Sequence, residues 1–155
     1  MFDNILERGE TIINIYKPNA KRYWKGVRLS LFFVLFPPVL IMAVLFTALS
    51  LGSLPFILWH FARKQYNNTY YCYTTKRLII RTGTIGIDYK SLEYKDITLT
   101  NINVGFLDKK FDTGNLLFSS PSTAHAIGFN FSHIEHPYDE MRNIKEYMDS
   151  VKNQK

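Results

Sequence analysis

Two pairs of adjacent basic residues are the clearest candidates for binding chemistry in this sequence. Lys76 and Arg77 form the first pair, with Arg81 four positions further on, and Lys109 and Lys110 form the second. Ammonium and guanidinium groups donate charge-assisted hydrogen bonds to phosphate and carboxylate oxygens. These residues predict contacts with an anionic group or a partner. A solvated loop or a packing role is the alternative for each pair.

The other reactive side chains do not form a catalytic or metal-binding pattern. His133 and His136 have a spacing found in some metal sites, but no cysteine or cluster of carboxylates completes a set of four ligands. The serines of 119–122 lack the glycine-flanked motif of a hydrolase nucleophile. We therefore expect no enzymatic activity, no metal and no cofactor.

A stretch of 34 residues without a charged side chain, 29–62, separates two basic clusters. Basic residues favour the cytoplasmic side of a membrane, and they stand at both ends, within 17–28 and at Arg63 and Lys64. Two legs of about 17 residues, roughly 26 Å each, place both clusters on one side. We predict a transmembrane hairpin over 29–62 with both termini in the cytoplasm. The alternative is a single span over about 29–51.

Aromatic and basic side chains flank this stretch and predict anchoring at the membrane interface, because their apolar stems and polar ends suit the headgroup level. The predicted anchors are Tyr23, Trp24, Arg28, Trp59, Arg63 and Lys64. Most of the net charge of +6 falls within residues 1–64. The basic balance is therefore a topology signal, and we expect a lipid bilayer and no nucleic acid among the partners.

The residues after Lys64 predict one small domain of strands followed by a helix. Short β-prone segments are separated by glycines and by a serine-proline cluster, as in an antiparallel sheet or barrel. The predicted strands lie at 69–75, 77–82, 85–89, 97–104, 116–120 and 127–131, with a bulge or bend near Thr100 and Asn101, where the apolar residues change face. Pro137 suits the first turn of the helix, whose apolar stripe should pack on the sheet. The stripe consists of Met141, Ile144, Met148 and Val151.

Three segments of this C-terminal part resemble the bacterial pleckstrin-homology (PH) domains of small membrane-anchored proteins. They are Tyr73–Ile79 followed by Gly83, Leu92–Ile97, and Leu107–Leu116, in which Asp112 replaces the usual first glycine. The resemblance implies a partly open antiparallel β-barrel closed at one end by the C-terminal helix. The predicted fold class is thus an α+β membrane protein, with an N-terminal segment 1–28, a hairpin 29–62 and a PH-like domain 69–155, at the bacterial cell membrane.

The resemblance also implies where binding would occur, although a fold alone does not specify a ligand. Eukaryotic relatives of the fold bind phosphoinositide headgroups at the first hairpin, where Lys76 and Arg77 lie. Our first hypothesis is a non-catalytic, membrane-anchored module that presents a binding or scaffolding surface to protein partners or to itself. The alternative is an anionic-lipid-sensing module with Lys76, Arg77, Lys109 and Lys110 as a headgroup cradle. A small membrane enzyme or transporter subunit is the least expected class.

Overall fold

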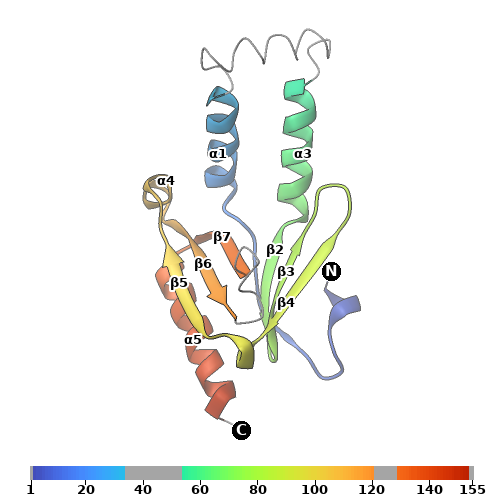
Figure 1. The fold of residues 1–155 in the computed structure, drawn as a ribbon, viewed down its shortest axis with the longest axis vertical. Helices are drawn as coiled ribbons and strands as arrows, with labels where there is room; N and C mark the ends of the chain where they lie inside the picture. The colour runs from blue at the N-terminus through green and yellow to red at the C-terminus, as the bar shows by residue number, and fades with distance from the viewer. Residues whose placement is uncertain (1, 34–53, 121–128, 154–155) are drawn as a thin grey trace.

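The computed structural model describes residues 2–33, 54–120 and 129–153, which form two small sheets, a pair of helices and a C-terminal helix (Figure 1). The elements that precede β2 in the chain are η1 (Asp3–Ile5), β1 (Ile12–Tyr16), α1 (Ala20–Phe33) and α3 (Leu54–Asn68). The strands that follow are β2 (Tyr70–Thr74), β3 (Arg77–Thr82), β4 (Asp88–Glu93), β5 (Leu99–Asn103), β6 (Thr113–Ser119) and β7 (Phe129–Glu135). The remaining helices are η2 (Tyr94–Asp96), α4 (Phe106–Lys110) and α5 (Pro137–Asn153).

Both sheets are antiparallel, in the orders β1-β2-β3-β4 and β5-β6-β7. The first sheet includes β1, which precedes both helices in the chain. Ile15 pairs with Cys72 and Tyr16 with Tyr71 across the β1–β2 ladder. The predicted domain limits of 69–155 leave this strand out, whereas the structure places it in the same sheet as β2.

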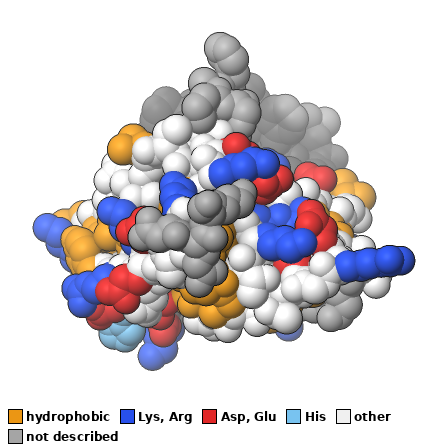
Figure 2. Space-filling model, turned by 90° about the horizontal axis from the view of Figure 1, so that it is seen from below, with side chains coloured by type: hydrophobic (Ala, Val, Ile, Leu, Met, Phe, Trp, Pro, Cys, Tyr) orange, Lys and Arg blue, Asp and Glu red, His pale blue; other side chains and the backbone are white. Residues whose placement is uncertain are grey.

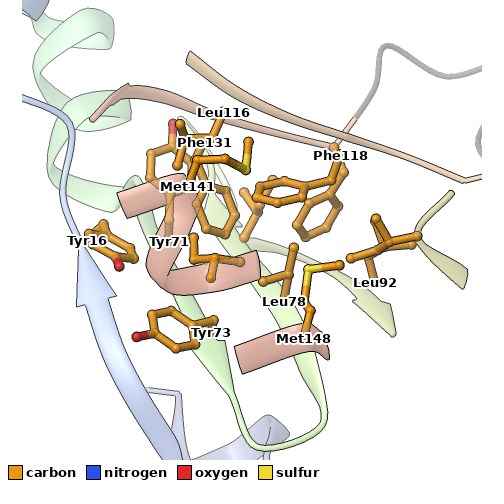
Figure 3. Close-up of a cluster of buried hydrophobic side chains, with 14 of the residues drawn as sticks. Tyr16, Tyr71, Tyr73, Leu78, Leu92, Leu116, Phe118, Phe131, Met141 and Met148 are labelled. Atoms are coloured by element: carbon orange, nitrogen blue, oxygen red, sulfur yellow. The ribbon is translucent and has the colours of Figure 1, made fainter. Parts of the chain in front are cut away.

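The core lies between the two sheets and α5. Figure 3 shows aromatic side chains of the first sheet facing Met141 and Met148 of α5. Met141, Ile144 and Met148 are buried, so the predicted packing of this stripe on the sheet is confirmed. Tyr16 joins the same core and lies 6.1 Å, between ring centroids, from Tyr73. The predicted PH-like sheet with a C-terminal helix is therefore present.

The predicted transmembrane hairpin is wrong. None of the helices that the structure describes is long and apolar enough to cross a bilayer. α1 has 14 residues, about 21 Å, and carries four basic side chains, while α3 has 15 and ends beyond Arg63 and Lys64. Residues 34–53, the centre of the predicted hairpin and most of the alternative span 29–51, lie outside the described residues.

This finding also corrects two predictions that depended on the hairpin. The fold class of a membrane protein and the localisation as a two-pass protein of the bacterial cell membrane, with cytoplasmic termini, both required spanning helices. The helices of the described ranges do not meet that requirement. The physical reason is that the apolar part of each described helix is short, because both helices also include residues of the basic clusters beside the charge-free stretch.

Candidate functional site

The first hairpin, between β2 and β3, holds its basic residues against the N-terminal segment. Arg77 donates from Nε (3.1 Å) and Nη2 (3.0 Å) to the two carboxylate oxygens of Glu10, and Nη2 also donates to the carbonyl of Ile5 (2.8 Å). The hydroxyl of Thr74 donates to the same Glu10 carboxylate (2.6 Å). Lys76 Nζ donates to Glu7 (2.9 Å). Both cations of this predicted site are therefore already paired.

The side chain of Glu10 is fully buried, so its charge state depends on the groups that contact it. Burial alone would raise its pKa, but the hydrogen bonds from Arg77, the Glu7 backbone and Thr74, with the charge of Arg77, lower it overall. The hydrogen bond to Glu10 in turn raises the pKa of Arg77. The hairpin therefore presents little uncompensated positive charge to a ligand.

The end of the molecule that carries this hairpin is electrically mixed. Figure 1 shows the β2–β3 turn at the end opposite to α1 and α3. Viewed from that end, acidic and basic side chains lie beside one another (Figure 2). Lys95 and Glu93 form another such pair, at 2.8 Å. An anionic headgroup would meet carboxylates as well as cations on this face.

Arg81 lies apart from Lys76 and Arg77, at the far end of β3. Its guanidinium is 5.8 Å from the centre of the Tyr70 ring, and Lys17 Nζ lies 4.8 Å from the same ring. The predicted contacts at the first hairpin are therefore divided between the two ends of one strand.

The second basic pair lies on α4, which is fixed to α1 through Asp108. Arg22 Nε donates to Asp108 Oδ1 (2.5 Å), the Gly105 backbone donates to Oδ2 (3.1 Å), and the Thr113 hydroxyl donates to Oδ1 (3.3 Å). Asp108 is 3% exposed, so these bonds replace water at a buried charge. Burial raises its pKa, but the hydrogen bond and charge of Arg22 lower it overall.

This anchoring leaves Lys109 and Lys110 exposed. Their helix, α4, lies beside the lower end of α1 (Figure 1). Neither lysine has an ion pair with a described residue. The structure therefore places the two predicted basic pairs at opposite ends of the domain. The single cradle of Lys76, Arg77, Lys109 and Lys110 is not assembled.

A groove of about 810 Å³ runs between α1 and α4. Lys21, Lys25 and Arg28 line it from α1, and α4 and the residue after it contribute Leu107 and Phe111. Lys25 Nζ lies 5.3 Å from the centre of the Phe111 ring. The three cations have no ion pair with a described residue, and the sequence of α1 contains no acid. We name this feature the α1–α4 groove.

Aromatic side chains join α1 to α3 and include most of the predicted interface anchors. The rings of Trp24 and Trp59 are 6.2 Å apart, the Tyr23 hydroxyl donates to the Ala62 carbonyl (3.0 Å), and Arg63 stacks over Trp59 at 5.4 Å. Arg28 lines a second groove, between α1 and α3, and Lys64 is exposed on α3. The large apolar residues toward the C-terminal end of α1 and in the N-terminal half of α3 are exposed. They are Leu29, Phe32, Phe56, Ile57, Leu58, Trp59 and Phe61.

The sequence prediction used Lys21 and Lys25 only as part of a topology signal and missed their place in a groove. Their helical spacing with Arg28, at i, i+4 and i+7, places the three on one face. A helical projection of 20–33 would have found that face. The pairing of Arg22 with Asp108 joins residues 86 positions apart and has no local signal.

The histidines do not assemble a metal site in the described ranges, where no three potential ligands come together. His133 faces Asp108, with 3.5 Å between Nδ1 and Oδ1, whereas His136 pairs with the exposed Asp112. Burial, and then the charge of Arg22, lower the pKa of His133. His125 lies outside the described residues.

The chain was compared with known proteins. The family model described as "Bacterial PH domain" matches residues 27–154. The fold is similar to that of a solved DUF1696 family protein with a pleckstrin-homology domain from Shewanella loihica PV-4, at a TM-score of 0.46 and 11% identity, over 97% of this chain and 88% of that one. No curated protein matches the chain. The resemblance seen in the sequence is thus confirmed, and the chain belongs to the bacterial PH domain family.

Proposed function

We propose that the protein is a non-catalytic binding module whose partner is an anionic lipid surface. The contact is made by the outer faces of α1 and α3 and by the basic residues beside them. The proposal requires contact with the lipid surface only, and no helix that crosses it. Its main support is the order of polarity along the two helices.

Along α1, cations come first and exposed apolar side chains follow. Lys21, Lys25 and Arg28 precede Leu29 and Phe32, which are 42% and 62% exposed. The rise from Lys21 to Phe32 is about 16 Å in an α-helix. Apolar side chains therefore extend beyond the cations, toward the C-terminal end of α1.

α3 has the same order, read in the opposite chain direction. Phe56, which is 75% exposed, and Trp59 lie toward the N-terminal end of α3, and Arg63 and Lys64 lie nearer the sheets. The two helices stand side by side and project from the same side of the domain (Figure 1). The apolar ends of the two helices therefore lie on the same side of the domain, and the cations of both helices lie nearer the sheets.

This arrangement matches the polarity profile of an anionic lipid surface. Apolar side chains of interfacial helices enter about 5–10 Å into the boundary between headgroups and acyl chains. Basic residues at the headgroup level contribute roughly 1 kcal/mol each toward anionic lipids. Consecutive exposed apolar residues such as Phe56–Trp59 are otherwise unfavourable in water.

A protein partner or a second copy, our first hypothesis from the sequence, is less well supported by these features. Protein interfaces commonly combine charges of both signs, whereas the exposed charged side chains of α1 and α4 are all positive. The paired hairpin at Lys76 and Arg77 gives no support to binding at the other end.

The test is flotation of the purified full chain with phosphatidylglycerol-containing vesicles. The variant Lys21→Glu/Lys25→Glu should lose most binding, because it reverses two cations at the headgroup level. Lys90→Glu/Lys145→Glu is the matched control, with the same charge change on exposed residues of β4 and α5. Equal loss in both variants, or none in either, would contradict the proposed surface. A stable protein complex or self-association without vesicle binding would support the scaffold hypothesis instead.

A further inference from the structure

We infer that the α1–α4 groove binds one anionic phospholipid, with an acyl chain along its apolar wall and the phosphate at Lys21 and Lys25. This inference rests on the proposed function and specifies the ligand of the same surface. It adds one requirement. Contact with a lipid surface needs only positive charge and exposed apolar side chains, whereas binding of a single lipid molecule needs a groove that encloses part of it.

The groove has walls from two separate elements. One wall is a continuous face of α1, and the other consists of Leu107 and Phe111. The α1 residues follow helical spacing and are Ala20, Lys21, Trp24, Lys25, Arg28, Leu29 and Phe32. Its volume of about 810 Å³ lies within the range of roughly 300–1,000 Å³ that is usual for small-ligand sites.

The lining chemistry selects an anionic amphiphile. Trp24, Phe32 and Phe111 offer apolar surface for a hydrocarbon chain, and Lys21 and Lys25 offer donors to a phosphate. Among the described residues no carboxylate lines the groove. A neutral chain would leave the cations without a counter-charge, and a free anion would leave the apolar wall exposed to water.

The groove is held open by the buried pair of Arg22 and Asp108, which fixes the distance between its walls. Gly105 permits the close approach at the start of α4, because a Cβ there would lie 2.9 Å from Asp108 Oδ2. Thr113 adds a hydrogen bond to the same carboxylate from β6. A site that is formed before the ligand arrives loses less entropy on binding.

The binding test uses monomeric short-chain phosphatidylglycerol, below its critical micelle concentration, with the full chain and calorimetric detection. We expect saturable binding of one lipid per chain. Glycerol phosphate, which lacks chains, and short-chain phosphatidylcholine, which is zwitterionic, should each bind about tenfold more weakly or not at all. Equal binding of glycerol phosphate would overturn the inference, because the chain would then contribute nothing.

Two variants test the two halves of the groove. Lys25→Glu should raise the Kd about tenfold, and Leu107→Gln should raise it several-fold by making the chain wall polar. Lys145→Glu on α5 is the charge-matched control and should keep the wild-type Kd. Circular dichroism checks that each variant is folded, and an unchanged Kd in both folded groove variants would contradict the site.

The inference and the proposed function fail separately. Vesicle binding without binding of the monomeric lipid would overturn the groove and leave the surface contact standing. Binding of the monomeric lipid without vesicle binding would overturn the proposed surface contact and leave the groove standing, as a site for a free lipid. Leu107→Gln is informative in both assays, because it should weaken lipid binding in the groove and leave vesicle flotation largely intact.

Discussion

Arg22 of α1 donates a hydrogen bond of 2.5 Å to Asp108 of α4, and both side chains are largely buried. This pair joins α1, which lies between β1 and β2 in the chain order, to a helix between β5 and β6. Removing one partner of a buried ion pair costs about 3–5 kcal/mol, because the other charge is left uncompensated. We expect Asp108→Ala to lower the free energy of unfolding by that amount in urea denaturation.

The exposed Asp112→Asn serves as the control for Asp108→Ala, because asparagine tolerates the positive φ of this position, and it should change stability by less than about 0.5 kcal/mol through loss of its surface pair. Similar, small effects of both substitutions would show that the Arg22–Asp108 pair does not fix α1 to the domain.

Acidification should destabilise the protein through the buried carboxylates of Glu10 and Asp108. The pKa values of Glu10 and Asp108 are lowered from their ordinary values of 4.5 and 3.8. A lowered folded-state pKa gives stability that is present above the unfolded pKa and is lost as the pH falls through the folded pKa. We expect the free energy of unfolding to decline below about pH 4.5. Glu10→Gln should make that decline shallower, and a stability independent of pH in this range would refute the assignment.

Gly114 marks a close approach between β6 and the start of α5. A Cβ at this position would lie 2.9 Å from two carbons of Pro137 and 3.1 Å from Val104. We expect Gly114→Ala to destabilise the protein by about 1–3 kcal/mol, as in other overpacked sites. Gly86→Ala is the control, since a Cβ there meets no atom within 4 Å. Thermal unfolding of the two variants compares them directly, and an equal shift would argue against the contact.

The first strand, β1, should be required for the two sheets to form a stable domain. Tyr16 is buried in the core, and its hydroxyl donates to Glu140 of α5 at 2.5 Å. A fragment of residues 69–155 lacks β1 and exposes the edge of β2 together with the core face near Tyr71 and Tyr73. We expect this fragment to unfold at lower urea concentration than the full chain, or to aggregate. A fragment with full-chain stability would show that β1 is dispensable.

The sequence predicted the parts of the fold that local patterns determine. The helix from Pro137 and its buried stripe follow from spacing and from proline at the first turn. Asp112, noted where the family has glycine, has a φ of +48°, a conformation that glycine adopts freely and aspartate tolerates.

The parts that depend on distant segments could not be predicted. β1 pairs with a strand that follows both helices, so nothing near Ile12–Tyr16 identifies its partner. Arg77 and Lys76 are adjacent basic residues in the sequence, but the carboxylates that neutralise them come from Glu7 and Glu10.

The positions of turns and strand ends also could not be predicted from the sequence patterns. Ile85 and Ile87 alternate as in a strand, yet β4 begins at Asp88. A predicted bend near Thr100 is absent, since β5 pairs with β6 without a register shift, and the shift lies between β6 and β7 instead. Alternation alone does not distinguish an extended turn from a paired strand.

The most direct test of the proposed function is flotation of the wild-type chain with phosphatidylglycerol-containing vesicles and with pure phosphatidylcholine vesicles. The proposal predicts binding to the anionic vesicles at low salt, little binding to the zwitterionic ones, and loss of much of the binding in about 1 M salt, where the Debye length is roughly 3 Å. Equal binding to both kinds of vesicle, or none to either, would contradict it.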